Sequence, residues 1–148
     1  MHNNLMKRCY AIARRAVGHG NHPFGALLFR DGEVLLEAEN TVVTEKDFTG
    51  HAELNLVRMA GQRLDPEILT DSLLYTSTEP CIMCQGAIYW AGITKIVYGV
   101  SGASLAELQS APWYVSSCDT FQRMHSKIEV SGPILEEEGM DIHRRFWK

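Results

Sequence analysis

The stretch that decides the fold is "SLLYTSTEPCIMCQGAIYWAGITKIVYGV", residues 72–100. Its first six residues form a nearly continuous apolar run, which is typical of a strand covered on both faces. Pro80 is well placed as the first residue of a helix that ends at Gly92. Residues 94–100 then predict another strand. A strand, a helix and a strand in this order predict parallel pairing, with the helix packed against the sheet.

The residues before this stretch predict two helices and a hairpin. Residues 3–18 carry their apolar side chains on one arc and their basic side chains on the other, which predicts an amphipathic helix. The segment "GALLFRDGEVLLEAEN" predicts two strands joined by a turn at Asp31-Gly32. Residues 51–60 predict the second helix, which we expect to end at Gly61.

The residues after this stretch continue the alternation of helices and strands. "SLAELQ" predicts a short helix, "KIEVSG" a last strand, and Pro133 opens a final helix that runs to "HRRFWK". Strands that alternate with helices imply one sheet with helices on both faces. The chain has 148 residues, 45% of them hydrophobic and 22% charged, which is the profile of one globular domain. We therefore predict a single α/β domain over residues 1–148, a three-layer α/β/α sandwich.

Composition also narrows the class of protein. The net charge of −4 argues against a protein whose main partner is nucleic acid. No apolar run approaches the length of a membrane span, and the first ten residues contain no apolar leader, so we expect a cytoplasmic protein with no membrane partner. In a reducing compartment, the four cysteines are expected to be free thiols or metal ligands rather than disulfides.

Three residues form a candidate metal site. Cys81 and Cys84 are spaced i and i+3, so their sulfurs face the same way from the first turn of a helix. His51 begins another helix and adds an imidazole, which completes a soft ligand set suited to tetrahedral zinc. Three protein ligands leave one position open for water, as in a catalytic site. Glu53, two residues after His51, is near enough to exchange a proton with that water.

Simpler explanations account for the parts of this pattern but not for the whole. Cys81 and Cys84 alone are compatible with a redox pair, His51 alone with a polar loop residue, and Glu53 alone with an acidic residue in the first turn of a helix. His-x-Glu is followed by residues 54–79 and then by Pro-Cys-x-x-Cys, and each half opens a helix. The joint pattern favours a zinc reaction centre.

This pattern is similar to the H-x-E…P-C-x-x-C signature of zinc deaminases, and residues 21–100 resemble the cytidine deaminase superfamily. The resemblance implies a five-stranded mixed sheet in an α/β/α sandwich, and a homodimer. It implies one Zn²⁺ per chain, held by His51, Cys81 and Cys84, with Glu53 as proton shuttle. The implied reaction is hydrolytic release of ammonia from an aminated ring carbon of a base, through zinc-bound hydroxide.

The segments "HPFGALLF", "GHAELNLVR" and "YTSTEPCIMCQGAIYWAGI" look most like bacterial guanine deaminases and related small nucleoside deaminases. We therefore expect a small-molecule substrate, a purine nucleobase or nucleoside such as guanine or guanosine. A cytosine- or cytidine-type pyrimidine deaminase and a tRNA adenosine deaminase are the alternatives. The acidic C-terminal third, with "EEE" at 136–138, argues against the phosphate contacts that RNA binding requires.

The resemblance also suggests residues that contact the substrate. Asn40 matches the family asparagine that ends the second strand and would donate a hydrogen bond to the base or sugar. Phe24 and Trp90 would stack on the base, or pack as ordinary core aromatics. The backbone carbonyl of Glu79 would receive the departing amino group. Ala52, which lies between His51 and Glu53, is expected to contact the substrate as well.

Beyond residue 100 the sequence departs from the family pattern, and this part is expected to decide the identity of the base. In "APWYVSSCDTF", residues 111–121, Trp113 and Asp119 are candidates for base recognition. Asp119 would accept hydrogen bonds from a guanidine-like edge, or it would simply cap a short helix. Phe146 and Trp147, near the C-terminus, either close over a pocket or pack the last helix.

Overall fold

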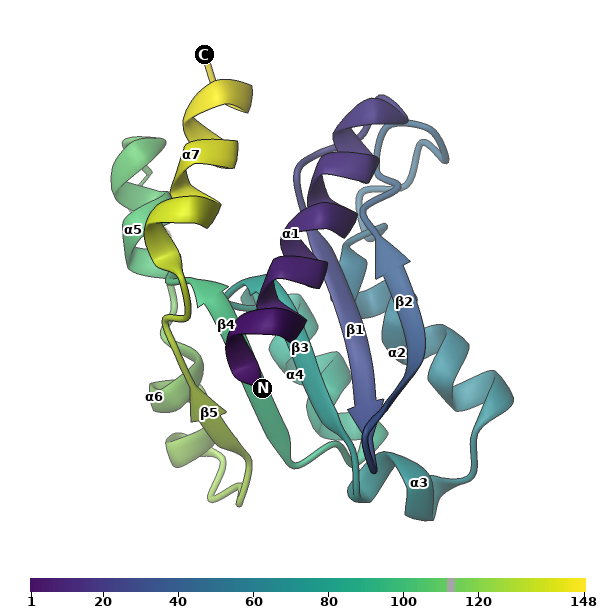
Figure 1. Ribbon diagram of the computed structural model, residues 1–148. Coiled ribbons are helices and arrows are strands. Elements are labelled where there is room, and N and C mark those ends of the chain that lie inside the picture. The colour runs from purple at the N-terminus through teal and green to yellow at the C-terminus, as the bar shows by residue number, and fades with distance from the viewer. Residues whose placement is uncertain (112–113) are drawn as a thin grey trace.

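The computed structural model describes residues 1–111 and 114–148, and it contains a five-stranded mixed sheet in the order β2-β1-β3-β4-β5 (Figure 1). The strands are β1 (Gly25–Arg30), β2 (Glu33–Glu39), β3 (Leu73–Thr78), β4 (Lys95–Val100) and β5 (Glu129–Ser131). The helices are α1 (His2–Gly18), α2 (Ala52–Arg63), α3 (Pro66–Thr70), α4 (Ile82–Ala91), α5 (Gly102–Leu108), α6 (Ser117–Arg123) and α7 (Glu136–Phe146). The predicted α/β fold with a five-stranded mixed sheet is confirmed.

Strand direction follows from the length of each connection. β1 and β2 pair antiparallel through the turn at Asp31 and Gly32, both of which have positive φ (50° and 80°), as a two-residue hairpin turn requires. β1 also pairs antiparallel with β3. β3, β4 and β5 are parallel, because a helix lies between each pair along the chain.

The two faces of the sheet bury different side chains. Neighbouring residues of a strand point to opposite faces, so Leu74 and Ile96 pack with α2 and α4, whereas Tyr75 and Val97 pack with α1 and α7. Figure 1 shows α1 on one face of the sheet and α2 and α4 on the other. This alternation produces a three-layer sandwich with two hydrophobic cores.

One edge of the sheet gathers the ends of several strands. The parallel strands β3 and β4 both finish there, so Glu79 and Ser101 lie at this edge. β1 runs in the opposite direction, and therefore Phe24, which precedes β1, lies at the same edge. Ligands of α/β proteins bind beyond the carboxyl ends of parallel strands, which makes this edge the place to look for a site.

Two helix boundaries differ from those predicted. α2 does not end at Gly61 but continues to Arg63. A glycine inside a helix costs only about 1 kcal/mol relative to alanine, which packing of the α2 core face offsets. Pro80 is not the first residue of α4, because Cys81 is the N-cap and the helix begins at Ile82. The helix does end at Gly92, whose φ of 77° is the left-handed conformation that a C-cap glycine adopts.

The elements differ from the prediction in three further places. α7 begins at Glu136 rather than at Pro133. The short helices α3 and α6 were not predicted, since neither carries as clear an apolar pattern as "SLAELQ", which overlaps the similarly short α5. In residues 1–111 and 114–148, no helix is both long enough and apolar enough to cross a membrane.

Candidate functional site

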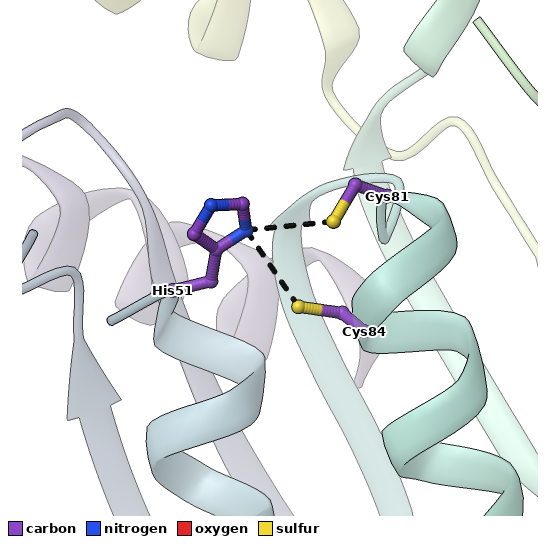
Figure 2. A group of neighbouring side chains, drawn as sticks. All are labelled: His51, Cys81 and Cys84. Carbon is purple, nitrogen blue, oxygen red and sulfur yellow. Dashed lines mark hydrogen bonds between the residues drawn. The ribbon is translucent and has the colours of Figure 1, made fainter. Parts of the chain in front are cut away.

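His51, Cys81 and Cys84 come together where two packed helices begin. His51 is the N-cap of α2, Cys81 is the N-cap of α4, and Cys84 lies in the first turn of α4. His51 Nδ1 lies 3.4 Å from Cys81 Sγ and 3.7 Å from Cys84 Sγ, and all three ligand atoms lie within 4.8 Å of one another. Figure 2 shows the imidazole facing both sulfurs across the gap between the helices.

The spacing of these atoms fits tetrahedral zinc. Zn–N bonds of about 2.0 Å and Zn–S bonds of about 2.3 Å, at a tetrahedral angle, place nitrogen and sulfur about 3.5 Å apart. The two observed separations bracket this value. Within the described residues, no fourth His, Cys, Asp or Glu joins the group. The donor set therefore fits a zinc ion with one coordination position left for a non-protein ligand.

The electrostatics of the group favour a thiolate. A hydrogen bond with Cys84 is the main cause that lowers the pKa of Cys81, to about 4; burial opposes this shift, and the contact with His51 supports it. The hydrogen bond with Cys81 in turn raises the pKa of His51. A thiolate is the form of cysteine that binds metal, so Cys81 already has the charge state that a zinc ligand needs.

Glu53 lies in the first turn of α2, and its side chain is only 5% exposed. Burial, together with the charge of Cys81, raises the pKa of this carboxyl to about 7. A carboxyl group with a pKa near neutrality can both accept and return a proton, as an acid–base catalyst must. It also lines the same cavity as His51 and Cys81.

A cavity of about 130 Å³ lies at the carboxyl edge of the sheet, and His51 and Cys81 of the ligand group line it. The residues that line it are Phe24, His51, Glu53, Thr78, Glu79, Pro80, Cys81, Ile82, Gly102, Leu105, Tyr114 and Val115. Its walls are mostly apolar, and the metal ligands His51 and Cys81 and the acidic residues Glu53 and Glu79 are among its polar members. Such a concave apolar cavity with a few convergent polar groups is typical of a small-ligand site.

The structure brings some of the predicted substrate residues to this cavity and not others. Phe24 and Glu79 line it. Asn40 and Ala52 are buried but are not among the lining residues. The Asn40 side-chain oxygen accepts hydrogen bonds from the backbone N–H groups of His22 (3.4 Å) and Val42 (3.1 Å), and therefore holds the loop after β2. Ala52 packs in the hydrophobic core.

Three further candidates lie elsewhere. Trp90 is 84% exposed in the last turn of α4, whereas the cavity lies at the start of that helix, eight residues or about 12 Å away. Asp119 is exposed in the first turn of α6, where its N–H is capped by the hydroxyl of Ser116, so Asp119 itself is not the cap. Trp113 lies outside the described residues.

Several lining residues were not predicted from the sequence. Thr78 is the last residue of β3, and Gly102 and Leu105 follow β4, so the rule that sites form beyond parallel strands points to all three. Tyr114 and Val115 belong to the segment in which Trp113 and Asp119 were the candidates. Both side chains are largely apolar, and an apolar residue in a sequence can belong either to a cavity wall or to the hydrophobic core.

The carboxylate of Glu79 fixes this wall. One carboxylate oxygen accepts hydrogen bonds from the N–H of Gly102 (3.0 Å) and the hydroxyl of Tyr114 (3.3 Å). The other accepts from the N–H (2.8 Å) and the hydroxyl (2.6 Å) of Ser117. A Cβ atom at position 102 would overlap the Tyr114 ring, so glycine allows this close approach. Glu79 thus joins the starts of α5 and α6 beside the metal ligands.

Comparisons with known proteins agree with this geometry. Residues 1–100 match the family "Cytidine and deoxycytidylate deaminase zinc-binding region". A probable cytosine deaminase of Schizosaccharomyces pombe is 34% identical over 96% of this chain and 90% of its own. Guanine deaminase of Bacillus subtilis is 41% identical over 72% of this chain and 69% of its own. A tRNA-specific adenosine deaminase of Agrobacterium fabrum is 31% identical over 98% of this chain and 93% of its own.

The fold agrees as well. The structure of guanine deaminase from Nitrosomonas europaea covers 95% of this chain and 81% of its own, with a TM-score of 0.81 at 23% identity. Over the matched residues, His51, Cys81 and Cys84 form the group that can hold the family's zinc ion. The chain therefore belongs to the cytidine and deoxycytidylate deaminase zinc-binding family and is a zinc-dependent deaminase.

Proposed function

We propose that this protein hydrolyses an aminated nucleobase, a purine such as guanine, to the corresponding oxo base and ammonia. The observation that carries the proposal is the cavity of about 130 Å³ that is lined by two of the three metal ligands, His51 and Cys81, and by Glu53. A cavity of about 150 Å³ in another protein holds benzene, so this volume suits one heteroaromatic base rather than a nucleotide. The guanine deaminase of Bacillus subtilis, at 41% identity, supports a purine.

Each residue of the site has a proposed part in the reaction. His51, Cys81 and Cys84 would hold zinc, which lowers the pKa of a bound water to about 7 and so supplies a nucleophile at neutral pH. Glu53 would accept a proton from that water and return it to the amino group that leaves. Its burial supports this part, because a carboxyl with a raised pKa gives up a proton near neutral pH.

The cavity walls would hold the base flat against these groups. Phe24 and Tyr114 supply aromatic faces, and Ile82, Leu105 and Val115 supply apolar contact. Glu79 lines the cavity, and its backbone carbonyl is the proposed acceptor for the departing amino group. Since Glu79 is fixed by four hydrogen bonds, its carbonyl is held in place before the substrate binds.

A pyrimidine of the cytosine type is the second candidate, because the probable cytosine deaminase of Schizosaccharomyces pombe is similar over nearly the whole chain. For a tRNA substrate, the net charge of −4 is unfavourable. We further propose that the chain acts as one domain and forms a homodimer.

Ammonia release from guanine, guanosine, adenine, cytosine and cytidine tests the substrate. We expect guanine to give the largest kcat/KM, and preference for cytosine would replace the purine proposal with the second candidate. Glu53→Gln should retain about one zinc per chain and lose at least 100-fold in kcat, since general acid–base catalysis contributes about 10²–10⁴. Glu67→Gln, an exposed residue of α3, is the matched control. Full activity in the Glu53 variant would refute the proposed mechanism.

A further inference from the structure

A chain of hydrogen bonds connects the end of α7 with the cavity. The indole nitrogen of Trp147 donates to His143 Nδ1 at 3.0 Å. The other ring nitrogen of His143, Nε2, lies 2.9 Å from the hydroxyl oxygen of Thr78. Thr78 is the last residue of β3, is only 4% exposed and lines the cavity. The three side chains thus connect residue 147 with the wall of the site.

The first bond determines the direction of the second. An indole N–H can only donate, so His143 Nδ1 must be the unprotonated, accepting nitrogen. A neutral imidazole then carries its proton on Nε2, and this N–H donates to Thr78. Because the Thr78 oxygen accepts from His143, its own hydrogen points elsewhere. Among the described residues, no acceptor for this hydrogen is found.

His143 is held neutral by its surroundings. It is 2% exposed, and burial lowers its pKa to about 4, so the ring is uncharged at neutral pH. Its packed neighbours are the Phe24 ring, with centroids 5.4 Å apart, and the Trp147 indole. The ring with a single proton, on Nε2, is therefore the form present at neutral pH.

The same helix also braces an aromatic wall of the cavity. Phe24, which lines the cavity, packs against both the His143 ring and the Trp147 indole, with its centroid 6.4 Å from the indole. Phe146 and Trp147 pack against His22 rather than extending away from the chain. The end of α7 thus supports the Phe24 side of the cavity. It also determines that the Thr78 hydroxyl accepts a hydrogen bond from His143.

We propose that Thr78 donates its hydroxyl hydrogen to an acceptor atom of the bound base, and that His143 and Trp147 are positioning residues that fix this polarity. This inference rests on the proposed function. It adds a requirement on the substrate: the edge of the base that faces β3 must present an unprotonated ring nitrogen or a carbonyl oxygen. A base with a ring N–H at that edge would face a donor and bind poorly.

Kinetics with guanine and cytosine, using whichever base the wild type deaminates, tests the hydrogen bond. Thr78→Val keeps the shape of the side chain and removes the hydroxyl, so KM should rise about 3- to 10-fold, the worth of one neutral hydrogen bond, with kcat little changed. Thr78→Ser should restore most of the loss. Thr94→Val removes a hydroxyl that bonds Thr70 O, away from the cavity, and serves as control.

The positioning part is tested by Trp147→Phe, which keeps an aromatic ring but removes the donor. We expect KM to rise in the wild-type background and not to rise further in the Thr78→Val background, because both changes remove the same bond. Additive effects, or an unchanged KM in Thr78→Val, would overturn the proposal.

Nitrogen-15 NMR of the His143 ring tests the relay without any substrate. The wild type should show a protonated Nε2 and a bare Nδ1, and Trp147→Phe should lose this single tautomer. A protonated Nδ1 in the wild type would overturn the relay. If the wild type releases ammonia from none of the bases and nucleosides of the substrate panel, the proposed function fails. The tautomer measurement still supports or overturns the relay independently of activity.

Discussion

Replacement of Glu79 by glutamine tests how the cavity wall is held. The carboxylate accepts four hydrogen bonds, two on each oxygen, from Gly102, Tyr114 and Ser117. A glutamine amide has the same shape but only one oxygen, so its NH₂ group must replace one of the two acceptors. The Tyr114 and Ser117 hydroxyls can rotate to accept from this NH₂. A backbone N–H cannot, so either Gly102 or Ser117 loses its acceptor.

The size of the effect follows from this count. A buried N–H left without a partner costs about 1–3 kcal/mol, and the remaining bonds lose the strength that a charged acceptor adds. We therefore expect Glu79→Gln to lower the free energy of unfolding by about 2–4 kcal/mol. With a urea slope of about 2 kcal/mol/M, the midpoint of unfolding should fall by about 1–2 M.

Urea unfolding and hydrogen exchange together measure this effect. Exchange of the backbone amides at 114–123 should accelerate in Glu79→Gln, because Ser117 N–H is one of the groups held. Glu67→Gln, at an exposed position, should leave both measurements within about 0.5 kcal/mol of the wild type. If Glu79→Gln also stays within that range and its exchange is unchanged, Glu79 does not hold the wall and the reasoning is wrong.

Three further predictions concern pH, metal and assembly. The pKa of His143 is about 4 in the folded chain, whereas that of the free side chain is 6.5. As the pH falls, the unfolded chain therefore takes up this proton before the folded chain does. The free energy of unfolding should consequently decrease by about 3 kcal/mol in total between pH 6.5 and pH 4. The midpoint of urea unfolding should show this decrease with pH in the wild type, and the contribution of His143 should be missing from the His143→Gln variant. Removal of zinc with a chelator should abolish ammonia release and lower the melting temperature, and added Zn²⁺ should restore both; activity that persists in metal-free protein would contradict the zinc site. Light scattering should give a mass twice the 16.6 kDa of one chain, whereas a value of one chain mass would exclude the homodimer.

The sequence predicted the metal group because its signals are local. Cys81 and Cys84 are one helical turn apart, so their spacing indicates that the two side chains face the same way, and His-x-Glu marks the start of a second helix. The alternation of strands and helices likewise predicted the parallel half of the sheet. The helix boundaries predicted at Gly61 and Pro80 differ from the observed ones, because tertiary packing overrides local preference at such positions.

The wall of the cavity could not be predicted in this way. Trp90 has an aromatic ring that could stack on a base, but it lies at the end of α4 that is far from the cavity. The sequence of a helix does not show which of its ends lies next to a cavity. Tyr114 and Thr78 are 36 residues apart in the chain and line one cavity only because β3 and the segment before α6 meet at the same edge of the sheet.

What the sequence determined by itself is the chemistry: the ligand types, their helical spacing and the order of the elements, all of which depend on neighbours a few residues away. What only the tertiary structure decided is the environment of that chemistry. Glu79 became the support of a wall because strands β3 and β4 end side by side. The orientation of the Thr78 hydroxyl depends on His143 and Trp147, residues more than sixty positions away that reach it through the packing of α7.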